Sequence, residues 1–155
     1  MTARHHQILI GVLIFLDQLC KFIAQRTLTF YTETPVLPGV SFIKVYNFGA
    51  AYGILQNFQG FLIGISFIVL LMGWIYRHQL VSSRVGYIGL SIIASGAVGN
   101  LIDRIVRGYV VDFIDIHIIP VFNLADLFIN IGILCLVIDT LKASKKNDIH
   151  TQPPQ

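Results

Sequence analysis

Long apolar runs alternate with polar connections along the chain, and this pattern predicts membrane-spanning helices. A helix needs roughly 17 to 25 mostly apolar residues to cross a hydrocarbon core about 30 Å thick. Runs near this length are Ile8 to Ile23, Phe58 to Tyr76, Val85 to Ile102 and Phe122 to Leu141. We therefore expect an all-α membrane core of four transmembrane helices, in a single membrane-embedded domain that covers residues 1–145.

The two longer connections have the composition of short strands. Residues 24–57 contain Pro35 and Gly39, followed by a β-branched and aromatic run from Val40 to Tyr46, which predicts a strand. Residues 105–121 contain an Arg-Gly turn and then a short extended piece from Tyr109 to Phe113. Together they predict a small β-sheet cradle that lies on the membrane.

Positive charges predict the orientation of the chain. An even number of spans places both termini on one side, and the basic residues near the ends of the runs fall on that side. They are Arg4, Arg77, Arg84, Lys142, Lys145 and Lys146. An excess of Lys and Arg marks the cytoplasmic side, so both termini are expected in the cytoplasm and the cradle outside it. The polar segment 146–155 is expected to be a disordered cytoplasmic tail.

Composition agrees with a membrane protein and excludes most soluble classes. Hydrophobic residues make up 55% of the 155 residues and charged residues 12%, with a net charge of +3. Soluble domains carry about 25% charged residues. The cations cluster at the ends of the apolar runs, which topology explains better than binding of nucleic acid does. Cys20 and Cys135 lie inside apolar runs, so no disulfide framework or CxxC metal site is expected.

The first apolar run has some features of a secretory signal. Arg4 precedes it, but no small-residue cleavage site follows. Asp17, Gln18 and Leu19 come directly before Cys20, and they also argue against a lipid-modified cysteine. We therefore expect a retained span.

Polar residues gather at the outer ends of the predicted spans. They are Asp17 and Lys21 of the first span, Asn100, Asp103 and Arg104 of the third, Asn123 and Asp126 of the fourth, and Asp112 of the adjoining connection. Ionisable groups in a membrane are energetically costly, so several at one depth indicate a functional site.

The spacing of these residues places them on helix faces. Asn100 and Arg104 share one face, and Asn123, Asp126 and Asn130 share another. A ridge of small residues, Ser91, Ser95 and Gly99, would let a neighbouring helix approach the third span closely. The fourth span is the expected neighbour.

Structural alternatives exist for several of these residues. Asp17 and Lys21 are an (i, i+4) pair that could simply neutralise each other, and Asp103 with Arg104 could form an interfacial ion pair. These alternatives need no ligand.

The remaining polar residues also have alternatives. Asn123 could be only an N-cap, with Asp126 favoured by the helix dipole. Asp112, Asp115 and His117 could suggest a metal site, but their spacing is nonspecific and no second histidine is near. We therefore expect no metal.

Five stretches carry a family resemblance when they are taken together. They are Asp17-Gln18 with Lys21, NFGAAYG from Asn47 to Gly53, GAVGNLIDR from Gly96 to Arg104, GYVVDF from Gly108 to Phe113, and FNLAD from Phe122 to Asp126. In this order and spacing the chain closely resembles the lipoprotein signal peptidase family, also called signal peptidase II or prolipoprotein signal peptidase. The resemblance runs from the first span through the last.

The resemblance implies a membrane-embedded aspartic endopeptidase of the bacterial cytoplasmic (inner) membrane. Asp112 and Asp126 would be its catalytic dyad, at the outer face. The substrates would be diacylglyceryl-modified prolipoproteins, cleaved just before the lipid-modified cysteine by a water that the dyad activates. Two close carboxylates share a proton and titrate as a pair, so neither a metal nor an organic cofactor is needed.

Other residues would line or support the site by the same resemblance. They are Asp17, Lys21, Asn47, Gly49, Asn100, Asp103, Arg104 and Asn123. Membrane lipids and peptide antibiotics such as globomycin would be further partners, the antibiotics occupying the cradle.

Two other classes of function fit some of the same residues. Buried Asp, Asn and Arg also build ion pathways, so a small transporter or proton conductor is one alternative. A structural subunit whose polar residues only join helices is the other. A conducting path should cross the bilayer, whereas the inner halves of the predicted spans carry few ionisable residues.

Overall fold

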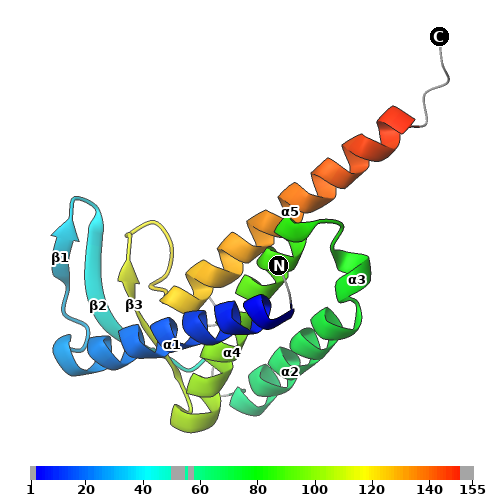
Figure 1. The fold of residues 1–155 in the computed structure, drawn as a ribbon. Helices are drawn as coiled ribbons and strands as arrows, with labels where there is room; N and C mark the ends of the chain where they lie inside the picture. The colour runs from blue at the N-terminus through cyan, green and yellow to red at the C-terminus, as the bar shows by residue number, and fades with distance from the viewer. Residues whose placement is uncertain (1–2, 50–54, 56–57, 151–155) are drawn as a thin grey trace.

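Three long apolar helices form the body of the protein (Figure 1). The computed structural model describes residues 3–49, 55 and 58–150. The three helices are α1 (Ala3–Thr27), α4 (Arg84–Arg107) and α5 (Leu124–His150), and each contains a stretch long and apolar enough to span a membrane. A mostly helical membrane architecture is therefore confirmed.

The second predicted span corresponds to a shorter helix. α2 (Gln59–Ile75) has 17 residues, which at 1.5 Å per residue is about 25 Å, less than the roughly 30 Å hydrocarbon core. Phe58 and Tyr76, the ends of the predicted run, are its flanking caps. A fourth span is thus not confirmed by length. One further turn of helix, α3 (Arg77–Leu80), connects α2 to α4.

The long helices extend beyond the predicted apolar runs. α4 continues five residues past Ile102 and ends at Arg107. Its C-cap is Gly108, whose φ of 77° is the left-handed conformation that suits glycine. α5 continues to His150, so the disordered tail predicted from residue 146 is helical over residues 146–150. A helix can continue through polar residues when protein partners or water satisfy the hydrogen bonds of their side chains. Hydropathy alone does not show whether such partners are present. Residues 151–155 lie outside the described part of the chain.

The predicted strands form an antiparallel sheet of order β1-β2-β3, made of β1 (Thr34–Leu37), β2 (Val40–Asn47) and β3 (Val110–Asp115). β1 and β2 are joined by a two-residue turn in which Gly39 has φ 78°. β3, from the second long connection, pairs with β2, and in this register Asp112 lies opposite Val45. The small sheet expected from both connections is confirmed.

Glycines allow α4 and α5 to pack closely. A Cβ added to Gly89 would lie 2.8 Å from the carbonyl oxygen of Gly132, and one added to Gly132 would lie 2.6 Å from that of Gly89. The ridge proposed from sequence turns mainly toward α1 instead, since Ser91 bonds His6 at 2.9 Å and Gly99 lies against Asp17. The expected pairing of α4 with α5 is correct, but Gly89 and not Ser91 provides its close contact.

Asp139, in the C-terminal part of α5, contacts the residues that precede α4. Only 2% of it is exposed, and its carboxylate accepts hydrogen bonds from the backbone N–H of Ser82 (2.7 Å) and the hydroxyl of Ser83. The position of Asp139 beside Lys142, near the end of the last apolar run, would by sequence alone favour a solvated charge. The carboxylate instead stabilises the N-terminus of α4, where the helix dipole favours an anion.

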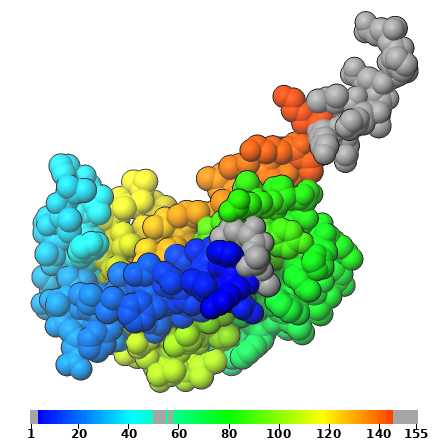
Figure 2. All heavy atoms as spheres, viewed as in Figure 1, coloured from blue at the N-terminus to red at the C-terminus, as the bar shows by residue number. Residues whose placement is uncertain are grey.

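The sheet lies at one end of the helical body. α1 runs from the N-terminus toward the sheet, while α3 lies at the opposite end (Figure 1). In the space-filling view the cyan hairpin and the yellow segment before α5 stand at the sheet end, and blue α1 meets green residues of the helices at the other (Figure 2). The polar residues singled out in the sequence gather where the sheet meets α4 and α5.

Candidate active site

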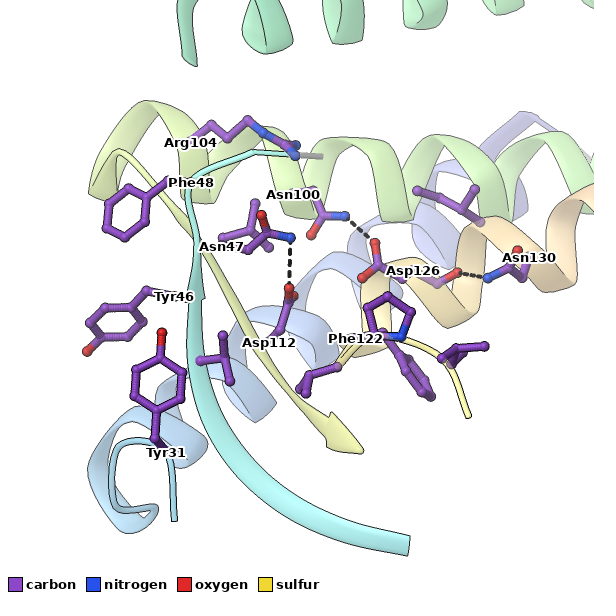
Figure 3. Close-up of a pocket in the computed structure, with 16 residues that line it drawn as sticks. Tyr31, Tyr46, Asn47, Phe48, Asn100, Arg104, Asp112, Phe122, Asp126 and Asn130 are labelled. Atoms are coloured by element: carbon purple, nitrogen blue, oxygen red, sulfur yellow. Dashed lines mark hydrogen bonds between the residues drawn. The ribbon is translucent and has the colours of Figure 1, made fainter. Parts of the chain in front are cut away.

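A cavity of about 920 Å³ opens between the sheet and the ends of α4 and α5. Asp112 and Asp126 both line it, and their carboxyl groups point into the same space (Figure 3). Asn47 and Asn100 line it beside them. The structure therefore brings together two carboxyl groups that come from a strand and a helix.

Asp112 is held on β3 by two amides. Asn47, its diagonal neighbour on β2, donates to Oδ2 at 3.0 Å, and Asn123 donates to Oδ1 at 2.6 Å. Burial, together with the nearby charge of Asp126, raises the pKa of Asp112 to about 7. The two amide bonds and Lys21 oppose this rise by favouring the charged form. Asp112 therefore exchanges its proton near neutral pH.

Asp126 is fixed by the start of α5. Its Oδ2 accepts the backbone N–H of Asn123 at 3.2 Å, and its own N–H donates to Asn123 Oδ1 at 3.0 Å. This reciprocal pattern is a capping box. Asn100 donates to Asp126 Oδ1 at 2.8 Å. Asn123 is thus an N-cap, as the structural alternative expected. The same side-chain amide also bonds Asp112, so capping does not exclude a role of Asn123 in positioning that carboxyl group.

Lys21 determines how the Asn100 amide is turned. Its ammonium can only donate, and it bonds Asn100 Oδ1 at 2.9 Å, as does the amide nitrogen of Asn123 at 3.2 Å. The Asn100 amide nitrogen must then face Asp126. A chain of bonds runs from Lys21 through Asn100 to Asp126, and it sets the position of that carboxylate.

Lys21 belongs to a buried charge cluster below the cavity. Asp17 and Asp103 contact its ammonium at 2.9 and 3.0 Å, and all three side chains are fully buried. Asp103 also pairs with Arg107, so two anions face two cations. Asp17 accepts the N–H of Ala125 at 2.9 Å, and Asp103 that of Val111 at 3.2 Å. The cluster therefore ties α1, α4, β3 and α5 together directly behind the two carboxyl groups.

Arg104 lines the cavity and does not form the ion pair with Asp103 that was one expectation. It donates from Nη2 to the carbonyl oxygen of Gly49 at 3.3 Å, and its buried Nε has no partner among the described residues. Gly49 in turn donates to Asn47 Oδ1 at 2.9 Å. Residues Ala50 to Gly53 of the same motif lie outside the described residues.

Some cavity residues were not anticipated from the sequence. Tyr31, Tyr46 and Phe48 form an aromatic wall, and Tyr46 stacks on Tyr109 with ring centroids 4.1 Å apart. Because side chains alternate along a strand, the sequence from Val40 predicts which residues share a face of the sheet with Tyr46. Only the tertiary structure shows that this face borders the cavity. Gln18, next to Asp17 and outside the cavity lining, donates to Asp103 Oδ1 at 3.2 Å and so joins the charge cluster, a role that its sequence position alone did not indicate.

A possible set of metal ligands lies outside the cavity lining. Glu33, Asp115 and His117 have ligand atoms within 4.8 Å of one another. Asp115 and His117 thus come together as the sequence alternative suggested, but their third member is Glu33 and not Asp112. His117 is bonded to Asp115, Nδ1 to Oδ2, at 3.3 Å.

Comparison with known proteins supports the sequence resemblance. The family described as Signal peptidase (SPase) II matches residues 9–142. A "Lipoprotein signal peptidase" of Caldicellulosiruptor bescii is 46% identical over 130 residues, 82% of this chain and 84% of that protein. One of Sinorhizobium fredii is 34% identical over 141 residues, 87% of this chain and 85% of that protein.

Two solved structures resemble the fold. Both are described as bacterial membrane enzymes studied by the in meso method. The first has a TM-score of 0.86 at 28% identity and covers 99% of this chain and 94% of its own. The second has a TM-score of 0.82 at 29% identity and covers 90% of this chain and 94% of its own. The fold is therefore that of a membrane enzyme.

Proposed function

Because this chain belongs to the signal peptidase II family, we propose that Asp112 and Asp126 are the catalytic dyad with which it cleaves its substrates. The chain is a membrane protease that removes signal peptides from prolipoproteins. The observation that carries the dyad is the shared cavity, which both carboxyl groups line. The buried Asn123, outside the lining, bonds both residues.

The two carboxyl groups take different parts in the reaction. Asp112, with a pKa of about 7, holds the proton and donates a hydrogen bond to the scissile carbonyl oxygen. Asp126, which accepts hydrogen bonds from Asn100 and Asn123, takes a proton from the attacking water. Water oxygen then bonds to the carbonyl carbon, and Asp112 stabilises the tetrahedral oxyanion. The C–N bond breaks as the amine leaves with the proton held by Asp126, so one water is consumed per bond cleaved.

The cavity suits an extended peptide with a lipid-modified residue. Asn47 and Arg104 contribute polar groups to its lining, and the aromatic wall of Tyr31, Tyr46 and Phe48 contributes apolar surface. Gly49, which bonds both Asn47 and Arg104, supports the two polar side chains. A diacylglyceryl-modified prolipoprotein remains in the bilayer, so cleavage just before its modified cysteine occurs near the headgroups. Peptide antibiotics such as globomycin would occupy the same cavity.

The topology follows from the arrangement of the helices. α2 acts as the fourth span, because a helix of about 25 Å is accommodated by a small local thinning of the bilayer. Arg77 and Arg84 flank the short connection at the end of the body opposite the sheet. Because an excess of basic residues marks the cytoplasmic side, we infer that this end and both termini are cytoplasmic. The cavity then faces the outer side.

Cleavage by dyad variants tests the proposal. Purified protein in detergent is incubated with a diacylglyceryl-modified prolipoprotein, with and without a chelator. Asp112→Asn and Asp126→Asn should each lower the cleavage rate at least about 100-fold while the protein still folds, because each removes one proton-transferring group. Wild-type cleavage should survive chelation.

The matched control is Asp115→Asn, on the same strand and outside the cavity lining. It should keep near wild-type activity. Normal cleavage by either dyad variant, with unfolding temperatures unchanged, would contradict the assignment. Loss of folding in Asp112→Asn would favour a structural role for Asp112.

A further inference from the structure

A second cavity, of about 530 Å³, lies between α1, α2 and α4 and uses none of the residues of the candidate active site. Ile10 of α1 and Val69 of α2 line two sides, and Ala94 and Ala97 of α4 contribute small side chains between them. A Cβ added to Gly73 of α2 would meet only Leu90, at 3.7 Å. These small residues leave an apolar groove on a surface that faces the bilayer.

Polar and basic groups gather at one end of this groove. His6 Nδ1 bonds Ser91 Oγ at 2.9 Å, and His78 Nδ1 bonds the Tyr87 hydroxyl at 2.7 Å. Arg77 also lines the groove. Among the described residues that line it there is no carboxylate, so its polar end favours an anion.

Arg77 is placed at the depth where headgroups lie. Its guanidinium sits 4.3 Å from the ring centre of Trp74, which is 67% exposed, and tryptophan is enriched at the membrane interface. Arg77 donates from Nη1 to the carbonyl oxygen of Trp74, and it forms no ion pair with a carboxylate of the described chain. Its charge is therefore available to a phosphate at the edge of the bilayer.

The groove has the depth of one leaflet. Its lining on α4 runs from Tyr87 to Ala97, eleven residues, and the ten steps between them span about 15 Å at 1.5 Å per step. This is half of a hydrocarbon core about 30 Å thick. One acyl chain therefore fits along it while the headgroup remains at the polar end.

We propose that this groove is a binding site for an anionic phospholipid of the leaflet nearest to α3 and the N-terminus. The phosphate binds Arg77, with the His6 and Tyr87 side chains beside it, and one acyl chain lies along Ala94 and Ala97. The site does not depend on the proposed dyad, because it shares no residue with it.

Native mass spectrometry of the purified protein in detergent tests this proposal. Phosphatidylglycerol and phosphatidylcholine with identical acyl chains are added in turn, and the lipid-bound fraction is measured. Wild-type protein should retain phosphatidylglycerol preferentially. Arg77→Gln should weaken this retention about tenfold, the effect expected from loss of one charge-assisted contact. It should weaken retention of phosphatidylcholine less, because the choline cation of that lipid already opposes Arg77.

Gly73→Leu should reduce retention of both lipids, because the new side chain fills the groove. Leucine has a better helix propensity than glycine, so this variant should fold, which thermal unfolding checks. Arg84→Gln, which removes a neighbouring exposed cation outside the lining, is the control and should bind as wild type does.

Three outcomes would overturn the site. The first is equal retention of phosphatidylglycerol by wild type and Gly73→Leu. The second is an equal loss of phosphatidylglycerol retention in Arg84→Gln and Arg77→Gln. The third is retention of glycerol phosphate as strong as that of the lipid. The first would exclude the groove, the second would indicate general surface charge, and the third would exclude the acyl chain.

Discussion

At the scale of single residues, Asn47 adjusts the proton affinity of Asp112. Its amide bonds the carboxylate and favours the charged form, so it lowers the pKa. Asn47→Ala should therefore raise the pKa of Asp112 further above its present value of about 7. If Asp112 acts in its protonated form, the wild-type rate falls as pH rises through about 7, and in Asn47→Ala this fall should begin about one pH unit higher.

The measurement is kcat for prolipoprotein cleavage between pH 5 and 9. Gln59→Ala serves as control, because Gln59 bonds the neighbouring carbonyl of Phe48 and not the carboxylate. Its midpoint should stay at the wild-type value. A lower rate in Asn47→Ala with an unmoved midpoint would assign Asn47 a purely structural role.

The buried ammonium of Lys21 holds the charge cluster together. Lys21→Met keeps most of the apolar stem but leaves Asp17 without a cation, and an unpaired buried charge costs about 3–5 kcal/mol. The free energy of unfolding in detergent should fall by this order. Cleavage should weaken too, because Asn100 loses the bond that turns its amide toward Asp126.

Arg26→Met is the control for Lys21→Met. Arg26 lies near the end of the same helix, exposed, with its guanidinium over Phe22. Its loss should change stability by less than about 1 kcal/mol. Equal destabilisation by the two variants would show that the cluster contributes no special stability.

The sequence predicted which polar residues meet but not every partner. Spacing on helices placed Asn100 and Asn123 toward one site, and the structure joins them. The pairing of Asp103 with Arg104 was wrong, because adjacent helical residues point about 100° apart. Arg107, four positions after Asp103, lies on its face and pairs with it.

At the scale of the helices and strands, the contact of α4 with α5 depends on the absence of side chains. Gly132→Ala would place a Cβ 2.6 Å from the carbonyl oxygen of Gly89 and 2.9 Å from the backbone nitrogen of Ile93. Backbone atoms cannot turn aside, so the helices must separate. We expect a loss of about 1–3 kcal/mol in unfolding free energy, measured by denaturation in detergent.

Gly64→Ala on α2 is the matched control, because a Cβ there meets nothing within 4 Å. It should leave the protein as stable or raise the unfolding free energy by about 0.5–1 kcal/mol, since alanine favours a helix. A Gly132→Ala protein as stable as Gly64→Ala would mean that the helix contact adjusts freely.

Apolar runs and β-branched runs predicted where most elements lie. Their ends and faces depend on tertiary contacts. α4 extends through Asp103 and Arg107 because these charges are paired inside the protein, where hydropathy alone suggests a boundary. The pairing of β2 with β3 joins distant parts of the chain, and no local pattern specifies that register.

At the scale of the whole molecule, the buried ionisable groups among the described residues occupy two separate places. Asp17, Lys21 and Asp103 lie behind the cavity at the sheet end, whereas Asp139 caps α4 at the other end. Between them α4 presents small residues such as Gly89 and Gly96 to α5. This arrangement favours a site at one depth over the continuous polar path that ion conduction needs.

The orientation of the molecule gives the last prediction. In a protein with Cys20 and Cys135 replaced by alanine, Leu37→Cys places a thiol on β1, where Leu37 is 65% exposed, and Lys145→Cys places one on the exposed far part of α5. A membrane-impermeant maleimide should label Leu37→Cys in intact spheroplasts and Lys145→Cys only after the membrane is opened. Labelling in the reverse order would place the cavity on the cytoplasmic side, and labelling of both in intact spheroplasts would place the two positions on the same side. Either result would contradict a cleavage site at the outer face, because the sheet that carries Asp112 also carries the labelled hairpin.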